Sequence, residues 1–361
     1  MISAKKIICF DLEGPLSPQD NAYDVMSEIP NGRDLFEKIS RYDDLLTLKM
    51  LGPSPNVDDR YEAGDTLALI VPFLSAHNLS NLDISRVSKR SIVVPGAKEL
   101  ISTLFKERWN VFVISTSYEW HAYNICNVLG IPQDNIFCTR LDLSVIKKSM
   151  DNDTRRLILD AEKDILKIND DRELKQFLDA FFFEDLPKSS YGNVLDKVKV
   201  IGGQKKLDAI ISISDKFNVS LGDIIAIGDS ITDYKMLGGI KREQGISVVF
   251  NGNEYAIPYA SIGLATLDMR WLHLITSCID RGSSFEDVFR LVDLWEAHRF
   301  SGLNSDLKFI KDNLSTDLTS NLEDLPFFHN ILKREGRPLD DIITVHKRYR
   351  GLIRGAAAKL G

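Results

Sequence analysis

The chain has 361 residues, of which 44% are hydrophobic and 27% are charged, and its formal net charge is -7. This length and composition are typical of a globular protein with a large core. The acidic balance argues against nucleic acid or an anionic membrane surface as the main partner. The four cysteines are far apart and form no C-x-x-C pair, so we expect reduced thiols. The apolar runs are too short for a signal peptide or a membrane span, which predicts a cytoplasmic protein without membrane insertion.

The first predicted element is a buried strand at residues 7–10 that leads directly into two acids, Asp11 and Glu13. Because side chains alternate along a strand, both carboxyl groups leave the sheet on the same side and share one small volume. Like charges this close repel unless a cation or a proton lies between them. The pair therefore predicts a metal-assisted reaction centre, and a solvated strand end is the alternative.

The rest of the chain alternates between strand and helix patterns, with two interruptions. Further β-branched apolar runs, typical of strands buried on both faces, occur at 111–114, 224–227 and 246–250. Amphipathic helix patterns follow or precede them, for example at 97–105 and 122–129. This alternation predicts an α/β fold with a doubly wound parallel sheet.

The interruptions divide the chain into four parts. We expect a core that consists of residues 1–17, 92–144 and 199–280. Mostly helical patterns predict a first insertion at 18–91, a second insertion at 145–198 and a helical C-terminal extension at 281–361.

Polar residues follow two of the later strands at the point where each ends. Ser115 and Thr116 come after the second strand, and their hydroxyl and backbone groups are suited to phosphate oxygens near a helix N-terminus. Asp229 and Asp233 follow the strand at 224–227. Ligands of open parallel sheets bind beyond the carboxyl ends of the strands, so we expect these groups to meet Asp11 there.

Several carboxylates and a hydroxyl at one sheet edge favour a hard cation, Mg²⁺, over zinc, because His and Cys are missing from these loops. A bound phosphate also requires a positive residue, which Lys205 or Lys206 can supply. The apolar positions at +3, +4 and +7 from Lys206 place it at the core-facing edge of its helix, so we favour Lys206 and keep Lys205 as the alternative.

The order of these motifs resembles the haloacid dehalogenase-like (HAD) phosphohydrolase superfamily. The family pattern is an aspartate with a second acid two residues on, a Ser or Thr, a Lys and a Gly-Asp-x-x-x-Asp, which here correspond to Asp11, Glu13, Ser115, Lys206, Gly228, Asp229 and Asp233. The resemblance implies a Rossmann-like core with helical cap domains at the two insertions. Each motif alone is weak, but their common order is specific.

The same resemblance implies a role for each matching residue. Asp11 would be the nucleophile that forms a phosphoaspartate, and Glu13 would act as acid and base. Mg²⁺ would be held by Asp11, the backbone carbonyl of Glu13 and Asp229. Phosphate would be bound by Ser115, Thr116 and Lys206, while Asp233 would orient the metal shell or hold the lysine.

Glu13 departs from the family pattern, since most members have Asp at this position. Glu occurs in a few branches, among them enolase-phosphatase and a phosphoserine phosphatase group that passes phosphate to another alcohol. Hydrolysis and phosphotransfer therefore both remain open, because they differ only in which hydroxyl attacks the phosphoaspartate.

The insertions imply a lid that favours a small phosphorylated metabolite over a phosphoprotein. The segments 11–18 and 250–254 also resemble an archaeal HAD branch that carries the name of subunit R of energy-converting hydrogenase A. This leaves a non-catalytic subunit or a regulatory module of a hydrogenase-type complex as an alternative from another class.

Two further features have an ordinary structural interpretation. His121 is expected on a helix face, with a substrate contact as the alternative. The tail at 346–359 has basic residues and no acid, which predicts a solvated helix face, while a phosphate-approach role or partner binding is the alternative. A protein partner or a homodimer through the extension is also possible on this pattern.

Overall fold

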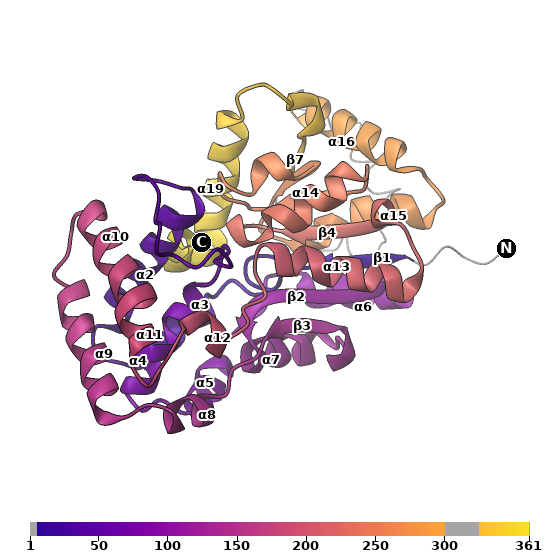
Figure 1. Ribbon diagram of the computed structural model, residues 1–361. Coiled ribbons are helices and arrows are strands. Elements are labelled where there is room, and N and C mark those ends of the chain that lie inside the picture. The colour runs from indigo at the N-terminus through magenta and orange to yellow at the C-terminus, as the bar shows by residue number, and fades with distance from the viewer. Residues whose placement is uncertain (1–5, 300–324, 361) are drawn as a thin grey trace.

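The computed structural model describes residues 6–299 and 325–360, and in these ranges seven strands form one sheet (Figure 1). The strand order is β3-β2-β1-β4-β5-β6-β7, and all neighbours are parallel except β6 and β7. The strands are β1 (Ile7–Phe10), β2 (Asn110–Tyr118), β3 (Ile136–Thr139), β4 (Ile224–Gly228), β5 (Ser247–Phe250), β6 (Ile262–Ala265) and β7 (Phe327–Asn330).

Helices cover both faces of this sheet, as the continuous apolar strands require. One face packs against α6 (Ala97–Lys106), α7 (Glu119–Leu129), α15 (His273–Asp280) and α16 (Phe285–Arg299). The other face packs against α13 (Gln204–Phe217), α14 (Tyr234–Arg242) and the start of α19 (Asp340–Arg354). The doubly wound α/β fold that the sequence predicted is confirmed.

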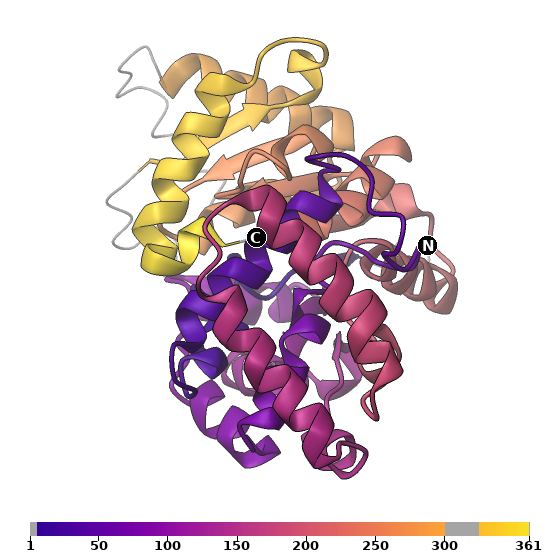
Figure 2. The ribbon, with the colours of Figure 1, turned by 60° about the vertical axis from the view of Figure 1, so that its left-hand side comes forward.

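The remaining helices form a separate layer, which we call the helical unit. It combines both segments that the sequence placed as insertions, whose helices lie side by side in Figure 2. Their apolar side chains share one hydrophobic cluster. Across it the hydroxyl of Tyr42 donates to Asp179 at 2.6 Å, and Phe73 packs edge-on against Phe182. Its helices are α1 (Asn21–Met26), α2 (Gly32–Thr47), α3 (Thr66–Leu69), α4 (Val71–Ala76), α5 (Asn81–Ser88), α8 (Leu143–Lys148), α9 (Asn152–Ile165), α10 (Asp171–Ala180), α11 (Leu186–Lys188) and α12 (Val194–Lys197).

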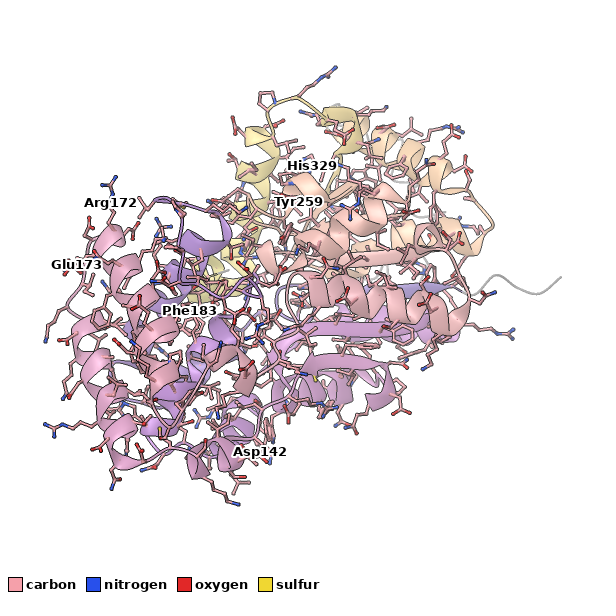
Figure 3. All side chains as sticks on the ribbon, viewed as in Figure 1. Asp142, Arg172, Glu173, Phe183, Tyr259 and His329 are labelled. Carbon is pink, nitrogen blue, oxygen red and sulfur yellow. The ribbon has the colours of Figure 1, made fainter. Side chains whose placement is uncertain are left out.

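The outer surface of the helical unit is charged. Arg172 and Glu173 on α10 lie at its edge (Figure 3), whereas Phe183 lies further in, with its ring 6.2 Å from that of Tyr61. This is the distribution expected for amphipathic helices that bury one face.

The C-terminal part differs from the helical extension that the sequence predicted. It contributes β7, which pairs antiparallel with β6 at the edge of the core sheet. Helix α19 then runs back, so that the C-terminus lies where the helical unit meets the sheet (Figures 1 and 2). Residues 300–324 of the predicted extension lie outside the described residues.

In the described ranges no single helix is long and apolar enough to cross a membrane; one bent pair, Thr66–Ala76 with Asn81–Ser88, meets the length and composition criteria only when both parts are combined.

Candidate active site

The site begins where β1 and β4 end side by side. These strands are parallel and in register, with Phe10 opposite Ile227, so Asp11 and Asp229 follow at the same edge of the sheet. The backbone N–H of Asp11 donates to the carbonyl of Ile227 at 2.8 Å and extends this pairing by one residue. Two carboxylates 218 positions apart in sequence are thereby brought into one volume, as expected from the topology.

Lys206 rather than Lys205 occupies this volume. Lys206 is completely buried in the first turn of α13, and its Nζ donates to Oδ1 of Asp11 and to Oδ1 of Asp233, both at 2.7 Å. Lys205 is half-buried on the adjacent side of the helix. The periodicity of the apolar residues in this helix therefore distinguished the two lysines correctly in space.

The loop after β4 is fixed by Asp233. Its Oδ2 accepts the backbone N–H groups of Asp229 at 2.9 Å and Ser230 at 3.1 Å. Gly228 is required there, because a Cβ at this position would lie 2.6 Å from the Asp233 side chain. Both oxygens of Asp233 are thus engaged by the protein, which leaves this residue suited to positioning its neighbours.

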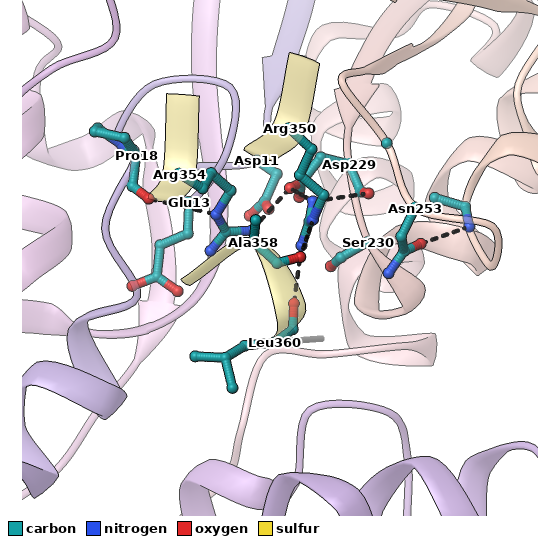
Figure 4. A network of polar contacts seen from close by, with 12 residues as sticks. Asp11, Glu13, Pro18, Asp229, Ser230, Asn253, Arg350, Arg354, Ala358 and Leu360 are labelled. Carbon is teal, nitrogen blue, oxygen red and sulfur yellow. Dashed lines mark hydrogen bonds and ion pairs between the residues drawn. The ribbon is translucent and has the colours of Figure 1, made fainter. Parts of the chain in front are cut away.

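Asp229 is held by two arginines that the sequence analysis did not assign to the site. Its Oδ2 accepts from Nη1 of Arg350 and, at 2.9 Å, from Nη1 of Arg354 (Figure 4). Its Oδ1 is buried and has no hydrogen-bond partner among the described residues. One oxygen of this carboxylate is therefore committed and the other is unpaired.

Glu13 lies beside Asp11 in a different environment. Its Oε1 accepts the backbone N–H of Asn21 at 2.8 Å and lies 3.6 Å from Nε2 of His121. The pKa of Glu13 is raised to about 8, mainly by burial and also by the neighbouring Asp20, while the Asn21 N–H offsets part of the shift. Burial also lowers the pKa of His121 to about 3, so its imidazole is neutral near neutral pH. Glu13 is protonated there because its own pKa is raised.

The charges of Asp11 and Lys206 depend on each other. The pKa of Asp11 is raised to about 7, because burial and the nearby Asp233 raise it by more than Lys206 lowers it. Burial alone would lower the pKa of Lys206, but Asp11 and Asp233 raise it overall. The lysine is therefore the cation that keeps the two carboxylates together.

The carboxylates also fit a divalent metal ion. Oxygens of Asp11, Asp229 and Asp233 lie within 4.8 Å of one another, and the unpaired buried Oδ1 of Asp229 is a ligand atom without another partner among the described residues. An all-oxygen donor set of this kind suits Mg²⁺. Asp233 already accepts a hydrogen bond at each oxygen, so Asp11 and Asp229 are the better candidates for direct ligands.

A small cavity of about 70 Å³ opens in front of these groups. Thr116, one of the predicted phosphate-binding residues, lines it, and the Thr116 hydroxyl has no partner among the described residues. Ser115 is buried behind it, where its hydroxyl accepts the N–H of Ser117 at 3.1 Å. Both residues belong to β2, which continues to Tyr118 instead of ending at residue 114 as predicted.

The cavity is bounded by all three parts of the molecule. The core, the helical unit and the C-terminal segment all contribute lining residues, which include Asp11, Glu13, Thr116 and Ser230, then Phe36, Ser40 and Thr66, and finally Arg354 and Leu360.

Comparison with known proteins agrees with this arrangement. Residues 85–261 match the family model of haloacid dehalogenase-like hydrolases. Among solved structures, gene product AF1437 from Archaeoglobus fulgidus is similar, with a TM-score of 0.78, 24% sequence identity and 99% of each chain covered. A substrate-bound phosphoserine phosphatase has a TM-score of 0.49 and 17% identity, with 75% of this chain and 97% of that chain covered. No curated protein sequence gives a significant match. The match over residues 85–261, the observed fold and the order of the motifs together show that this chain is similar to haloacid dehalogenase-like hydrolases.

Proposed function

We propose that the protein is a Mg²⁺-dependent phosphatase that hydrolyses a small phosphomonoester through a phosphoaspartate on Asp11. The observation that carries this proposal is the environment of Asp11, a buried carboxylate with one oxygen on Lys206, beside the unpaired oxygen of Asp229, at the wall of a cavity. An anionic nucleophile reaches an anionic phosphoryl group only where positive charge offsets the repulsion.

In the first step, a carboxylate oxygen of Asp11 attacks phosphorus and the bond from phosphorus to the ester oxygen breaks. The leaving alcohol takes the electron pair of that bond, and Glu13 gives it a proton. The raised pKa of Glu13 supports this role, because the group is a carboxylic acid at neutral pH. In the second step, water attacks phosphorus while Glu13 takes a proton from that water. The bond from phosphorus to the Asp11 oxygen breaks, its electron pair returns to the Asp11 carboxylate, and inorganic phosphate is released.

The phosphoryl oxygens need donors on several sides. We assign Lys206 and the hydroxyl of Thr116 as donors, with Ser115 supporting the strand end behind them. Asp11, Asp229 and the backbone carbonyl of Glu13 would hold Mg²⁺, which supplies positive charge to the phosphoryl oxygens when bound. Asp233 would position Lys206 and the loop that carries Asp229.

A small substrate is favoured because the cavity is narrow and the helical unit covers it. Its volume of about 70 Å³ suits a phosphoryl group with little else, whereas typical ligand pockets measure roughly 300–1,000 Å³. Phe36 and Ser40 of α2 are among its lining residues. We therefore infer that α2 contacts the organic part of the substrate when the helical unit opens.

The experiment is a screen for phosphate release from many phosphomonoesters with Mg²⁺ or with EDTA. Wild type is compared with Asp11→Asn and with Asp215→Asn, a control that changes an exposed carboxylate on α13. We expect release by wild type and by the control, both with Mg²⁺ only. Release that is equal in Asp11→Asn, or absent from wild type for every ester, contradicts the proposal and favours a non-catalytic subunit.

The final acceptor is tested with the same proteins. Glu13 is one carbon longer than the usual aspartate, and this motivates phosphotransfer as the second candidate. Simple alcohols are added at increasing concentration, and both free phosphate and new phosphate esters are measured. A hydrolase releases one phosphate for each ester consumed, whereas a phosphotransferase releases less phosphate as the alcohol concentration rises.

A further inference from the structure

Two arginines from the C-terminal segment enter a site that is otherwise built by strand ends and helix starts. Arg350 and Arg354 are four residues apart on α19, so they lie on the same face of the helix. Their side chains are 2% and 5% exposed, and both reach Oδ2 of Asp229 (Figure 4). Buried guanidinium groups are costly, which indicates that their contacts compensate for a large desolvation penalty.

Every nitrogen of the Arg350 guanidinium has an acceptor in the protein. Its Nε donates to the carbonyl of Ala358 at 3.0 Å, its Nη2 donates to the carbonyl of Leu360 at 2.9 Å, and its Nη1 pairs with Asp229. These bonds fold the last residues back over the guanidinium. The role of Arg350 is therefore to fix the tail and one oxygen of Asp229.

Arg354 differs because it retains donor capacity. Its Nη1 pairs with Asp229 at 2.9 Å, and its Nε makes a long contact of 3.4 Å with the carbonyl of Pro18. No acceptor for its Nη2 is found among the described residues. Arg354 also lines the cavity together with Asp11 and Thr116, and Figure 4 shows its guanidinium between Glu13 and Asp11.

The charges around the cavity indicate what this free donor binds. Five carboxyl groups face three cationic groups there, namely Asp11, Glu13, Asp20, Asp229 and Asp233 against Lys206, Arg350 and Arg354. A dianionic phosphoryl group needs more positive charge than Lys206 alone supplies. Arg354 is the residue that offers it with unused N–H groups, and a guanidinium is suited to two phosphate oxygens.

We propose that Arg354 binds an oxygen of the substrate phosphoryl group, so that the C-terminal segment completes the substrate site. This inference rests on the proposed phosphatase function. Arg350 acts through Asp229 and the tail as a positioning residue, whereas Arg354 touches the substrate. The covering of the cavity by Leu360 follows from the same docked tail.

The test measures binding of inorganic phosphate by calorimetry in the presence of Mg²⁺, with wild type, Arg354→Gln and Arg354→Lys. The control is Arg348→Gln, which removes an exposed arginine from the same helix. Loss of a charged hydrogen bond to phosphate predicts a Kd about 10- to 100-fold weaker for Arg354→Gln. We expect a smaller loss of phosphate affinity in Arg354→Lys, which keeps the positive charge but lacks the paired N–H donors of a guanidinium. The control should have the Kd of wild type.

Thermal unfolding and Mg²⁺ binding without phosphate separate this role from a structural one. The proposal expects the Mg²⁺ affinity of Arg354→Lys to stay close to that of wild type while its phosphate affinity falls. Should Arg354→Gln fail to fold, Arg354→Lys carries the comparison.

Two outcomes would overturn the inference. One is unchanged phosphate affinity in both variants. The other is faster hydrolysis and tighter phosphate binding after substitution of Arg354, which would show that this side chain blocks the cavity. An inactive wild type would refute the phosphatase function instead, and the phosphate-binding comparison would still decide the role of Arg354.

Discussion

Replacement of Lys206 by methionine removes a buried charge from between two carboxylates and keeps most of the side-chain volume. Lys206 is completely buried and pairs with Asp11 and Asp233 at 2.7 Å each. Because the variant leaves both acids without their cation, we expect it to lose stability as well as activity.

The magnitude follows from the number of contacts that are lost. Breaking a buried ion pair by removing one partner costs about 3–5 kcal/mol. Two carboxylates share this lysine, so we expect a loss in the upper part of that range in EDTA. The cost depends on pH: burial already raises the pKa of Asp11 to about 7, and the variant raises it further. A carboxyl group whose pKa is raised in the folded state does not reduce the free energy of unfolding below its unfolded-state pKa. It reduces that free energy as pH rises through the folded-state pKa. The variant should therefore approach wild type near pH 4–5 and diverge from it towards pH 8.

Mg²⁺ should restore part of this loss, because it would bind to the same carboxylates. Binding to the native state alone stabilises by about 2.7 kcal/mol at a free metal concentration 100 times the Kd. Urea unfolding of wild type and Lys206→Met, each with EDTA and with increasing Mg²⁺, measures both terms. We expect a larger gain in the variant than in wild type.

Lys205→Met is the matched control, because this half-buried lysine is adjacent in sequence but points elsewhere. Its unfolding free energy should change by only about 0.5 kcal/mol. Equal losses in the two variants, or a Mg²⁺ gain that is no larger in Lys206→Met, would refute the reasoning.

Two further predictions concern the loop that carries the acids. Since the pKa of Glu13 is raised to about 8, phosphate release should fall as pH rises above 8. In Glu13→Gln, Asp11 should still take the phosphoryl group from p-nitrophenyl phosphate, because that leaving group needs no acid. The phosphoprotein should then accumulate, and intact-mass measurement after an acid quench would detect it. Gly14→Ala should abolish phosphate release, because Gly14 has a φ of +105° and an added Cβ would lie 2.2 Å from Oδ2 of Asp229. Its control is Gly282→Ala, where φ is +83° and nothing lies within 4 Å, so both variants bear backbone strain but only Gly14→Ala should lose activity. Early loss of phosphoprotein in Glu13→Gln, or full activity in Gly14→Ala, would contradict the assigned geometry.

The sequence was sufficient to predict the central strands and the residues that follow them. A run such as Ile224–Gly228 is short, apolar at every position and rich in β-branched residues, which favours a strand buried on both faces. The position of Lys206 was also predictable, because helix phase relative to the core depends only on nearby residues. Both inferences use local information that does not depend on the rest of the fold.

The peripheral strands were harder to predict for a physical reason. β7 is four residues long and ends in His329 and Asn330, so it has no continuous apolar run. Its pairing with β6 is determined by the chain's return to the sheet edge. β3 and β6 are as short as β1, but each contains a single Ile and no Val, so neither has the β-branched run that identified β1.

The arginines of the tail could not be assigned from local pattern at all. The sequence predicted a solvated basic helix at 346–359, whereas Arg350 and Arg354 are buried against Asp229, more than 120 positions earlier. The absence of acids from this stretch and the spacing of four residues were the available indications. Neither names a partner, because the partner lies in another part of the sequence.

The charge balance indicates that the metal and the tail support each other instead of competing. Because Glu13 is protonated near neutral pH, the other four carboxylates exceed the three cationic groups by one charge, and the proposed Mg²⁺ would offset this excess. Oδ2 of Asp229 binds the arginines while Oδ1 stays unpaired among the described residues, so the guanidinium groups leave a ligand atom for the metal. Each cation lowers the cost of burying the same carboxylates. Removal of Mg²⁺ should therefore leave the tail holding a site with excess negative charge, and the docking of Arg354 should become more important for stability as the metal is withdrawn.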